Sequence, residues 1–252
     1  YCDNAAFHPS YSTAGKSLHQ QMDEGIEFHK VRYRTTEHYL AYFQSFSNTY
    51  GPLEKLKALY EEALMHPMVV GIVIGTRPDC VDEEKLDYLA ALAKGEAMPG
   101  WSRNINGEER HAPIVIVEYG IESCYDSTLV RINRGHDFET ARRAVEMTAE
   151  RGIDTGAHFI LGLPMQRRED IAEEITRINA LGVDFVKFHQ LQVYRNTPMA
   201  REWCDKPERF LFANGFKLED YVVMMVDMIR HLDPAIAIER FASQAPRHLI
   251  LS

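Results

Sequence analysis

The stretch Val69-Val70-Gly71-Ile72-Val73-Ile74-Gly75, followed by Thr76-Arg77-Pro78-Asp79, decides the fold expected of this chain. Seven consecutive residues without a polar side chain predict a β-strand that is covered on both faces, as strands in parallel sheets are. A polar loop follows, and Asp82 then caps a helix. The inward stripe of that helix is supplied by Leu86, Leu89, Ala90 and Ala93. The pattern is a strand–helix unit with polar groups after the strand.

The same unit recurs along the chain. Further strands are expected at residues 39–44, 113–118, 155–161, 183–193 and 236–241. Helices are expected at 16–33, 52–64, 82–93, 137–151, 168–181 and 218–232, with a short helical turn at 127–132. We expect a surface loop or hairpin at 94–112 and an irregular cover at 196–214.

About six strands that alternate with helices predict an α/β domain with a parallel sheet, open or partly closed. A doubly wound Rossmann-like sheet is the alternative. It is less favoured because no GxGxxG motif follows any of the strands. We expect one domain over residues 1–252, with a C-terminal cover from about 196 to 252.

Composition narrows the class of partners. The chain has 252 residues and a net charge of −9, so contact with a nucleic acid would require a local basic patch. We find no apolar run long enough to span a bilayer and no secretory signal. The four cysteines are Cys2, Cys80, Cys124 and Cys204; they are widely spread and form no CxxC pair, which predicts a reducing cytoplasm.

Polar signals follow most of the expected strands or lie in the loops behind them. They are Gln44-Ser45, Thr76-Arg77-Pro78-Asp79, Glu118 to Ser123, Asn133-Arg134-Gly135-His136, and Gly162-Leu163-Pro164. In both architectures the ligand binds at the carboxyl ends of the strands, so we expect these groups to share one site. The chain begins with Tyr1-Cys2-Asp3-Asn4.

This series, in this order, resembles the Elp3-like radical S-adenosylmethionine (SAM) enzymes, and within them the YhcC-like group. The resemblance implies a partial (β/α)6-type TIM barrel whose first strand lies upstream of Tyr1. It also implies a [4Fe-4S] cluster, which would cleave SAM reductively to a 5′-deoxyadenosyl radical that acts on an unknown substrate. Cys2 would be the cluster ligand, together with two cysteines upstream, because the family's ligand loop ends Cys-x-aromatic-Cys-x-Asn. Tyr1 and Asn4 would flank the cofactor in that loop.

For SAM itself, the resemblance points to the strand-end motifs. Gln44 and Ser45 stand where relatives carry a glycine-rich turn that meets the methionine amino group. Arg134, in an Asn-Arg-x-His signature, would meet the SAM carboxylate, and the backbone at Gly162 would lie along the adenine. His158 would touch the ribose, although a lone histidine in an apolar strand is more often a hydrogen-bonded core residue.

Three charged residues allow two interpretations each. Arg77 offers a planar fork for a carboxylate, or it supports its loop through Asp79 or Asp82. Glu118 and Glu122 would accept from ribose hydroxyls or from the SAM amino group, or they would form an acid/base pair or a metal site.

Lys187, His189 and Gln192 are candidate substrate contacts at the barrel mouth. A buried lysine and histidine need partners, and the alternative for Lys187 is an internal ion pair with Glu118.

Two other classes remain open from the residues alone. One is a SAM-independent metal or acid/base barrel that uses Glu118, Glu122, His158 and His189. The other is a non-catalytic scaffold that has lost the cluster. Within the radical SAM interpretation, RNA is a candidate substrate because Elp3 relatives act on transfer RNA, and the implied electron donor is a flavodoxin or ferredoxin.

Overall fold

The computed structural model of the protein describes residues 11–12, 15–213 and 215–251, and Tyr1, Cys2 and Asn4 lie outside this part. Six of the described strands form one parallel sheet in the order β1-β2-β5-β6-β7-β8. They are β1 (Tyr39–Phe43), β2 (Val69–Thr76), β5 (Ile114–Glu122), β6 (Asp154–Leu161), β7 (Phe185–Gln190) and β8 (Ala237–Arg240). An antiparallel hairpin, β3 (Arg103–Ile105) and β4 (Glu108–Arg110), occupies the expected loop before β5.

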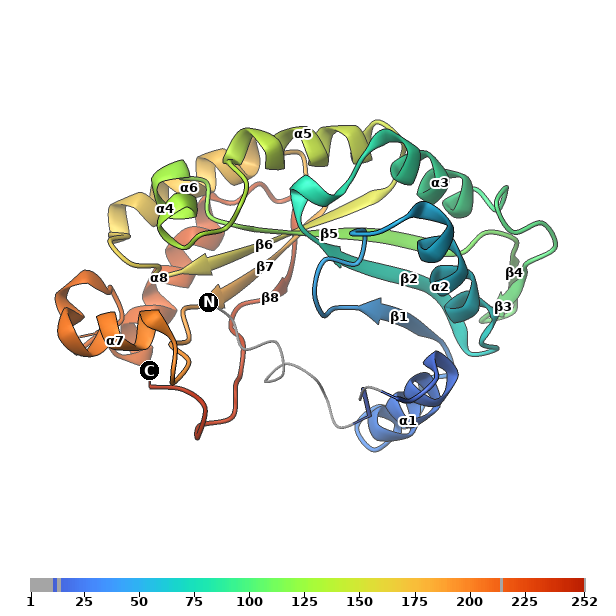
Figure 1. Cartoon of the computed structure of the whole chain (residues 1–252), viewed down its shortest axis with the longest axis horizontal. Helices are drawn as coiled ribbons and strands as arrows, with labels where there is room; N and C mark the ends of the chain where they lie inside the picture. The colour runs from blue at the N-terminus through green and yellow to red at the C-terminus, as the bar shows by residue number, and fades with distance from the viewer. Residues whose placement is uncertain (1–10, 13–14, 214, 252) are drawn as a thin grey trace.

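The α-helices are α1 (Leu18–Lys30), α2 (Leu53–Met65), α3 (Glu83–Ala93), α4 (Asp126–Arg131), α5 (Phe138–Ala149), α6 (Arg168–Asn179), α7 (Pro198–Asp205) and α8 (Leu218–His231). Short 3-10 turns lie at η2 (Pro78–Cys80) and η3 (Pro207–Arg209). Figure 1 shows a curled sheet whose convex face is covered by α2, α3, α5, α6 and α8. The concave face opens between α1 and α7 (Figure 1). Among the described helices, none is both long and apolar enough to cross a membrane.

Local sequence explains most of these elements. Every residue of β2 is buried, as the apolar run predicts. The side chain of Asp82 accepts the amide of Lys85 at the start of α3, and Asp137 accepts the amide of Thr140 at the start of α5. The glycine after α6, Gly182, has a φ of +74°, the left-handed conformation that commonly ends helices.

The arrangement is a half-barrel. The strand order follows the chain order and the helices that cover the sheet lie on its convex face, whereas a doubly wound sheet carries helices on both faces. The expected partial TIM barrel is therefore confirmed, and the Rossmann-like alternative is wrong.

Three expected boundaries were wrong. The strand expected at 113–118 runs to Glu122, because its backbone stays paired with β6 as far as Glu122 and the side chains of Tyr119 and Ile121 are buried in the core. The strand expected at 183–193 is only Phe185–Gln190. Residues 196–214 were expected to be irregular, but they contain α7, whose Thr197 cap and Pro198 at the first helical turn are standard start signals.

Candidate functional site at the strand ends

A buried polar cluster lies on the concave face around Glu118. Tyr42 Oη donates to Glu118 Oε2 at 2.6 Å, His158 Nε2 lies 2.7 Å from the same oxygen, and Lys187 Nζ donates to Oε1 at 2.6 Å. Lys187 also reaches Glu239 Oε2 at 2.8 Å. Five strands (β1, β5, β6, β7 and β8) thus contribute one side chain each. Val117 and Tyr119 lie in the core on the other face, as strand alternation requires.

Glu118 is held as a carboxylate. It is only 2% exposed, and burial alone would raise its pKa. The hydrogen bond and charge of His158, together with those of Lys187, outweigh burial and lower the pKa of Glu118 to about 2. Because a carboxylate only accepts hydrogen bonds, His158 carries its proton on Nε2. The internal ion pair between Lys187 and Glu118 is therefore present, and Glu118 lies inside the barrel and not at a strand end.

His189 is a neutral imidazole next to this cluster. Its ring stacks on that of His158, with centroids 5.6 Å apart. Burial, followed by the nearby charges of His158, Arg240 and Lys187, lowers the pKa of His189 to about 3. Within the described residues its Nε2 is buried and has no hydrogen-bond partner.

The second polar group lies at the carboxyl end of β5. Arg134 Nε donates to the carbonyl of Gly120 at 3.0 Å, and its Nη2 contacts the same carbonyl and lies 3.3 Å from Glu122 Oε1. A β-bulge between Gly120 and Glu122 and a φ of +73° at Glu122 turn this carboxylate toward Arg134. The two side chains remain 21% and 18% exposed. A cation and an anion are therefore presented side by side to the mouth of the barrel.

The loop after β2 joins this group. Arg77 Nε donates to Asp79 Oδ1 at 2.8 Å, so the loop-supporting ion pair expected as one alternative is present. The Arg77 guanidinium also lies against Gly135, where an added Cβ would come within 2.8 Å of Nη2. The loops after β2 and β5 and the loop after α4 thus meet through arginine side chains.

The turn after β6, from Gly162 to Gln166, follows the strand that neighbours β5 in the sheet. Gly162 has a φ of +82°, and a Cβ there would approach the ring of Phe212 to 2.4 Å. Both observations require glycine. The amides of Gly162 and Leu163 donate to Gln166 Oε1 at 2.7 and 3.2 Å, which fixes the turn.

The remaining expected residues are dispersed. Gln44 and Ser45 follow β1, where the neighbouring Asn48 bridges the carbonyls of Phe43 and Gly75. Gln192 Nε2 donates to the carbonyl of Ser243 and thereby holds the C-terminal segment. Cys2, Tyr1 and Asn4 lie outside the described residues, so their expected roles stay predictions.

Sequence reasoning missed three side chains that the structure brings to these groups. Tyr42 and Glu239 join the interior cluster, and Glu174 lies behind the strand ends. Only Tyr42 carried a signal, as a polar-tipped aromatic residue near the end of its strand. The other two could not be found, because Lys187, the partner of Glu239, and Ser123 and Cys124, which donate to Glu174, are 50 or more residues away in sequence.

The described residues do not by themselves provide a metal site. No group of three or more histidine, cysteine, aspartate or glutamate side chains in this part could hold a metal ion. Cys124 is fully buried, Cys204 is exposed, and Cys80 is intermediate. A cluster would therefore depend on Cys2 and its neighbours.

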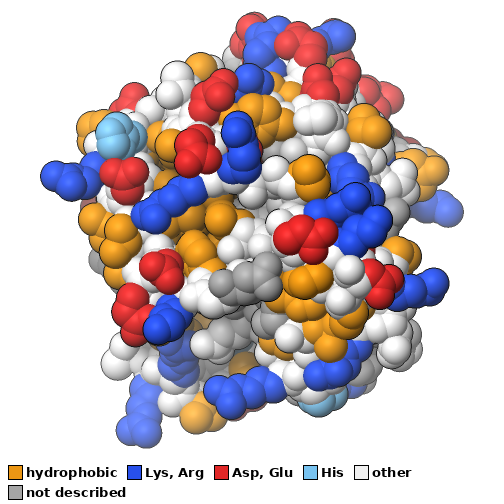
Figure 2. Space-filling view, turned by 90° about the vertical axis from the view of Figure 1, so that its left-hand side faces the viewer, with side chains coloured by type: hydrophobic (Ala, Val, Ile, Leu, Met, Phe, Trp, Pro, Cys, Tyr) orange, Lys and Arg blue, Asp and Glu red, His pale blue; other side chains and the backbone are white. Residues whose placement is uncertain are grey.

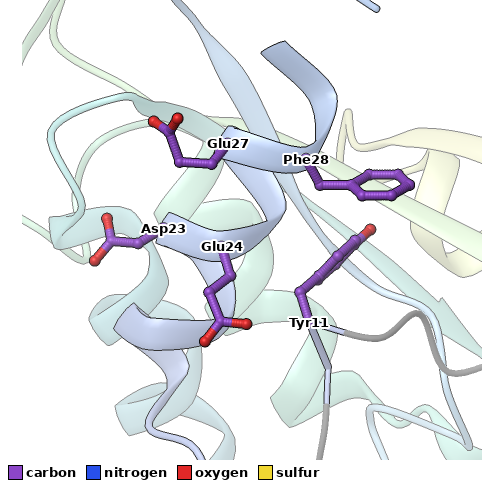
Figure 3. Close-up of a pocket in the computed structure, with 5 residues that line it drawn as sticks. All are labelled: Tyr11, Asp23, Glu24, Glu27 and Phe28. Atoms are coloured by element: carbon purple, nitrogen blue, oxygen red, sulfur yellow. The ribbon is translucent and has the colours of Figure 1, made fainter. Parts of the chain in front are cut away.

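A hollow of about 430 Å³ lies elsewhere, beside α1. Its lining residues are Tyr11, Asp23, Glu24, Glu27 and Phe28 (Figure 3). Each of the three carboxylates already has a basic partner, in His66, Lys16 and Lys30. The hollow is remote from the strand ends and offers no free charge, so it is not our candidate site.

Comparison with known proteins identifies one family model and several sequence relatives. The model of the Radical_SAM C-terminal domain matches residues 183–252. Protein YhcC of Escherichia coli K12 is 31% identical over 234 residues, covering 93% of this chain and 69% of that protein. YtqA of Bacillus subtilis 168 is 31% identical over 230 residues, covering 89% of this chain and 65% of that protein. The chain thus spans about two thirds of the length of these relatives.

Among solved structures, the archaeal Elp3 of Methanocaldococcus infernus, with an N-terminal deletion, superposes with a TM-score of 0.70. The alignment covers 92% of this chain and 54% of that chain at 18% identity, so it supports the fold alone. The sequence relatives carry the family assignment. The chain belongs to the YhcC-like family of radical SAM proteins.

Proposed function

We propose that the protein is a radical SAM enzyme that binds SAM at the carboxyl ends of β5 and β6. The observation that carries the proposal is the Arg134–Glu122 pair, which lies beside the backbone of Gly120 at the mouth of the half-barrel. The methionine part of SAM is a zwitterion with a carboxylate next to an ammonium. A guanidinium and a carboxylate placed side by side match both charges.

The turn after β6 and the neighbouring loops suit the nucleoside part of SAM. The glycine turn at Gly162 lets the backbone approach a flat ring closely, because no side chain intervenes. Gln44, Ser45 and Arg77 lie in the loops that follow the neighbouring strands and are further proposed contacts. His158 is committed to Glu118, so its proposed ribose contact uses the remaining face of the ring.

The cluster is proposed from the family. Cys2, flanked by Tyr1 and Asn4, would bind it together with two cysteines of the same loop. When bound, a [4Fe-4S] cluster supplies the electron that cleaves SAM into methionine and a 5′-deoxyadenosyl radical. The role of the described chain is to orient SAM and to surround the reactive carbon with the concave face.

The interior geometry weakens the acid/base alternative. Glu118 accepts from Tyr42, His158 and Lys187, and its pKa of about 2 makes it a poor proton acceptor near neutral pH. Glu118 and Glu122 also have different partners, so they do not form the acid/base pair considered from sequence.

For the substrate, we propose RNA as the first class to test. Exposed basic residues of the C-terminal cover include Arg195, Arg201 and Lys206. Figure 2 looks onto the strand-end face and shows basic side chains intermingled with acidic ones. Binding that weakens steeply with salt would support this class. A flavodoxin or ferredoxin is the proposed electron donor.

The function is tested on full-length protein that is reconstituted anaerobically with iron and sulfide and then given dithionite and SAM. We expect 5′-deoxyadenosine from the wild type and none from Cys2→Ala. Arg134→Gln should weaken SAM binding about tenfold or more, since a charge-assisted contact is lost. Arg142→Gln is the matched control, because Arg142 lies on the outer surface of α5 and pairs only with helix carboxylates.

Two results would count against the proposal. A well-folded wild-type protein that takes up no iron and yields no 5′-deoxyadenosine would favour the scaffold. Equal SAM binding by Arg134→Gln and Arg142→Gln would move the cofactor site away from β5.

A further inference from the structure

Glu174 is a buried carboxylate on α6 that the proposed chemistry does not use. It is 1% exposed, and both of its oxygens are occupied. Oε1 accepts from Ser123 Oγ at 2.8 Å and from the amide of Cys124 at 2.7 Å. Oε2 accepts from Gln166 Nε2 at 2.9 Å. A buried acid with three donors is part of a specific network and not a solvated surface group.

The network joins two segments that are about 40 residues apart. One is Ser123–Cys124, which directly follows Glu122 and its left-handed backbone. The other is the turn after β6, because Gln166 uses its own Oε1 to hold the amides of Gly162 and Leu163. One carboxylate on the outer helix layer therefore connects the ends of β5 and β6. A non-glycine residue at φ +73° persists only where its surroundings hold it.

We infer that Glu174 is a positioning residue for the SAM site. It acts on two walls of that site: through Ser123 and Cys124 on the segment that follows β5, and through Gln166 on the turn that follows β6. The inference rests on the proposed function. Glu174 touches no cofactor itself. It sets the direction in which Glu122 presents its carboxylate to Arg134, and it keeps the Gly162 turn at the matching distance across the site.

The chemistry of the donors adds a pH dependence. Three donors suit the ionised carboxylate, whereas a protonated Glu174 would place its hydrogen against the Gln166 or Cys124 donor or would force the Ser123 hydroxyl to accept instead of donate. Burial raises the pKa of Glu174 to about 7, against these hydrogen bonds and the charge of Arg177. The other groups that face it do not titrate near neutrality: burial raises the pKa of the Cys124 thiol well above its usual range and that of Tyr125 to about 12. We therefore expect the hydrogen-bond network around Glu174 to become more stable as pH rises from 6 to 8.

The central variant is Glu174→Gln. Its amide can satisfy Ser123 and Cys124 only by turning its NH2 group toward the NH2 group of Gln166, which is a donor facing a donor. The exchange Gln166→Glu/Glu174→Gln removes this conflict. The carboxylate at position 166 then accepts from Gly162, Leu163 and the new amide, and the oxygen at position 174 still accepts from Ser123 and Cys124. All contacts are restored with the charge moved to the other residue.

Glu173→Gln is the matched control on the same helix. Glu173 is 62% exposed and reaches only Arg177, at 3.4 Å. It removes the same charge from α6 without itself contacting Ser123, Cys124 or Gln166, and it leaves in place Arg177, which donates to the carbonyl of Cys124.

Two readouts are measured on the full-length protein with its cluster reconstituted and on the same protein without cofactors. The first is SAM affinity by calorimetry from pH 6 to pH 8. The second is amide hydrogen exchange at residues 123–125 and 162–166 without cofactors. We expect Glu174→Gln to weaken SAM binding about tenfold, to flatten its pH profile and to speed exchange in both segments. The double exchange should recover most of the affinity, and Glu173→Gln should match the wild type.

SAM affinity within twofold of the wild type in Glu174→Gln, with the wild type binding normally, would overturn the inference. Loss of affinity that the double exchange does not recover would overturn it as well, since the hydrogen-bond pattern would then not be the cause. Absence of SAM binding by the wild type would refute the proposed function and the inference together. In that case the exchange data would still show whether Glu174 joins the two walls.

Discussion

Glu118 and Glu122 lie on the same strand, four residues apart, yet their surroundings differ in kind. Glu118 is 2% exposed and receives hydrogen bonds from three other strands, whereas the side chain of Glu122 is 18% exposed and faces only Arg134. The carboxylate of Glu118 uses its hydrogen bonds on side chains of other strands and so stabilises the inner face of the barrel. The carboxylate of Glu122 keeps free hydrogen-bonding capacity at the mouth.

This contrast indicates where a ligand can bind on such a sheet. A buried charge is stable only when it is fully paired, and a fully paired charge has little left for a ligand. Depth along the strand therefore separates support from binding, although the two residue types are identical.

The largest effect should come from breaking the interior cluster. Lys187→Met leaves the buried Glu118 without its lysine partner, so we expect the free energy of unfolding to fall by about 3–5 kcal/mol. Urea unfolding at neutral pH measures this change. Lys57→Met is the control, because Lys57 pairs with an 82% exposed Glu54 and should cost less than about 1 kcal/mol. Equal losses in the two variants would contradict the assigned supporting role.

The second effect concerns acid. The pKa of Glu118 is lowered from its usual 4.5 to about 2 in the folded protein, so its stabilisation is present above pH 4.5 and is lost as pH falls toward 2. The difference is worth about 3 kcal/mol at full ionisation. The free energy of unfolding of the wild type should therefore fall more steeply from pH 5 to pH 2.5 than that of Glu118→Gln. If the free energies of unfolding of the wild type and of Glu118→Gln fall in parallel with pH, Glu118 is not the group that causes the loss of stability in acid.

The smallest effect should come from the mouth. Asp79→Asn removes the partner of Arg77, but both side chains are about one third exposed, so stability should change by less than about 1 kcal/mol. Thermal unfolding measures this change in stability, and Glu146→Gln, on the outer surface of α5, is the control variant. A loss comparable with that of Lys187→Met would erase the contrast between interior and mouth.

Much of the fold could be predicted from sequence. The apolar run of β2, the caps at Asp82 and Asp137, and the alternation of strands and helices indicate a parallel sheet with helices between the strands. These signals are local, so they act within a few residues of where they are read. The Gly162 turn is of the same kind.

The site was less predictable because its contacts are long-range. The apolar run of β5 stops at Glu118, so the sequence indicates a strand end there, but the strand continues to Glu122. Burial of Glu118 becomes favourable only when Tyr42, His158 and Lys187 arrive from other strands, 40 to 76 residues away.

The strand–helix order, the half-barrel class and the family were thus predictable from the amino-acid sequence. Long-range contacts in the folded chain are what enclose Glu118, bring Glu122 to Arg134, and let Glu174 connect the segments that follow β5 and β6. The physical reason is that hydropathy and capping are properties of neighbouring residues, whereas the pairing of a buried charge depends on side chains that only the folded chain brings together.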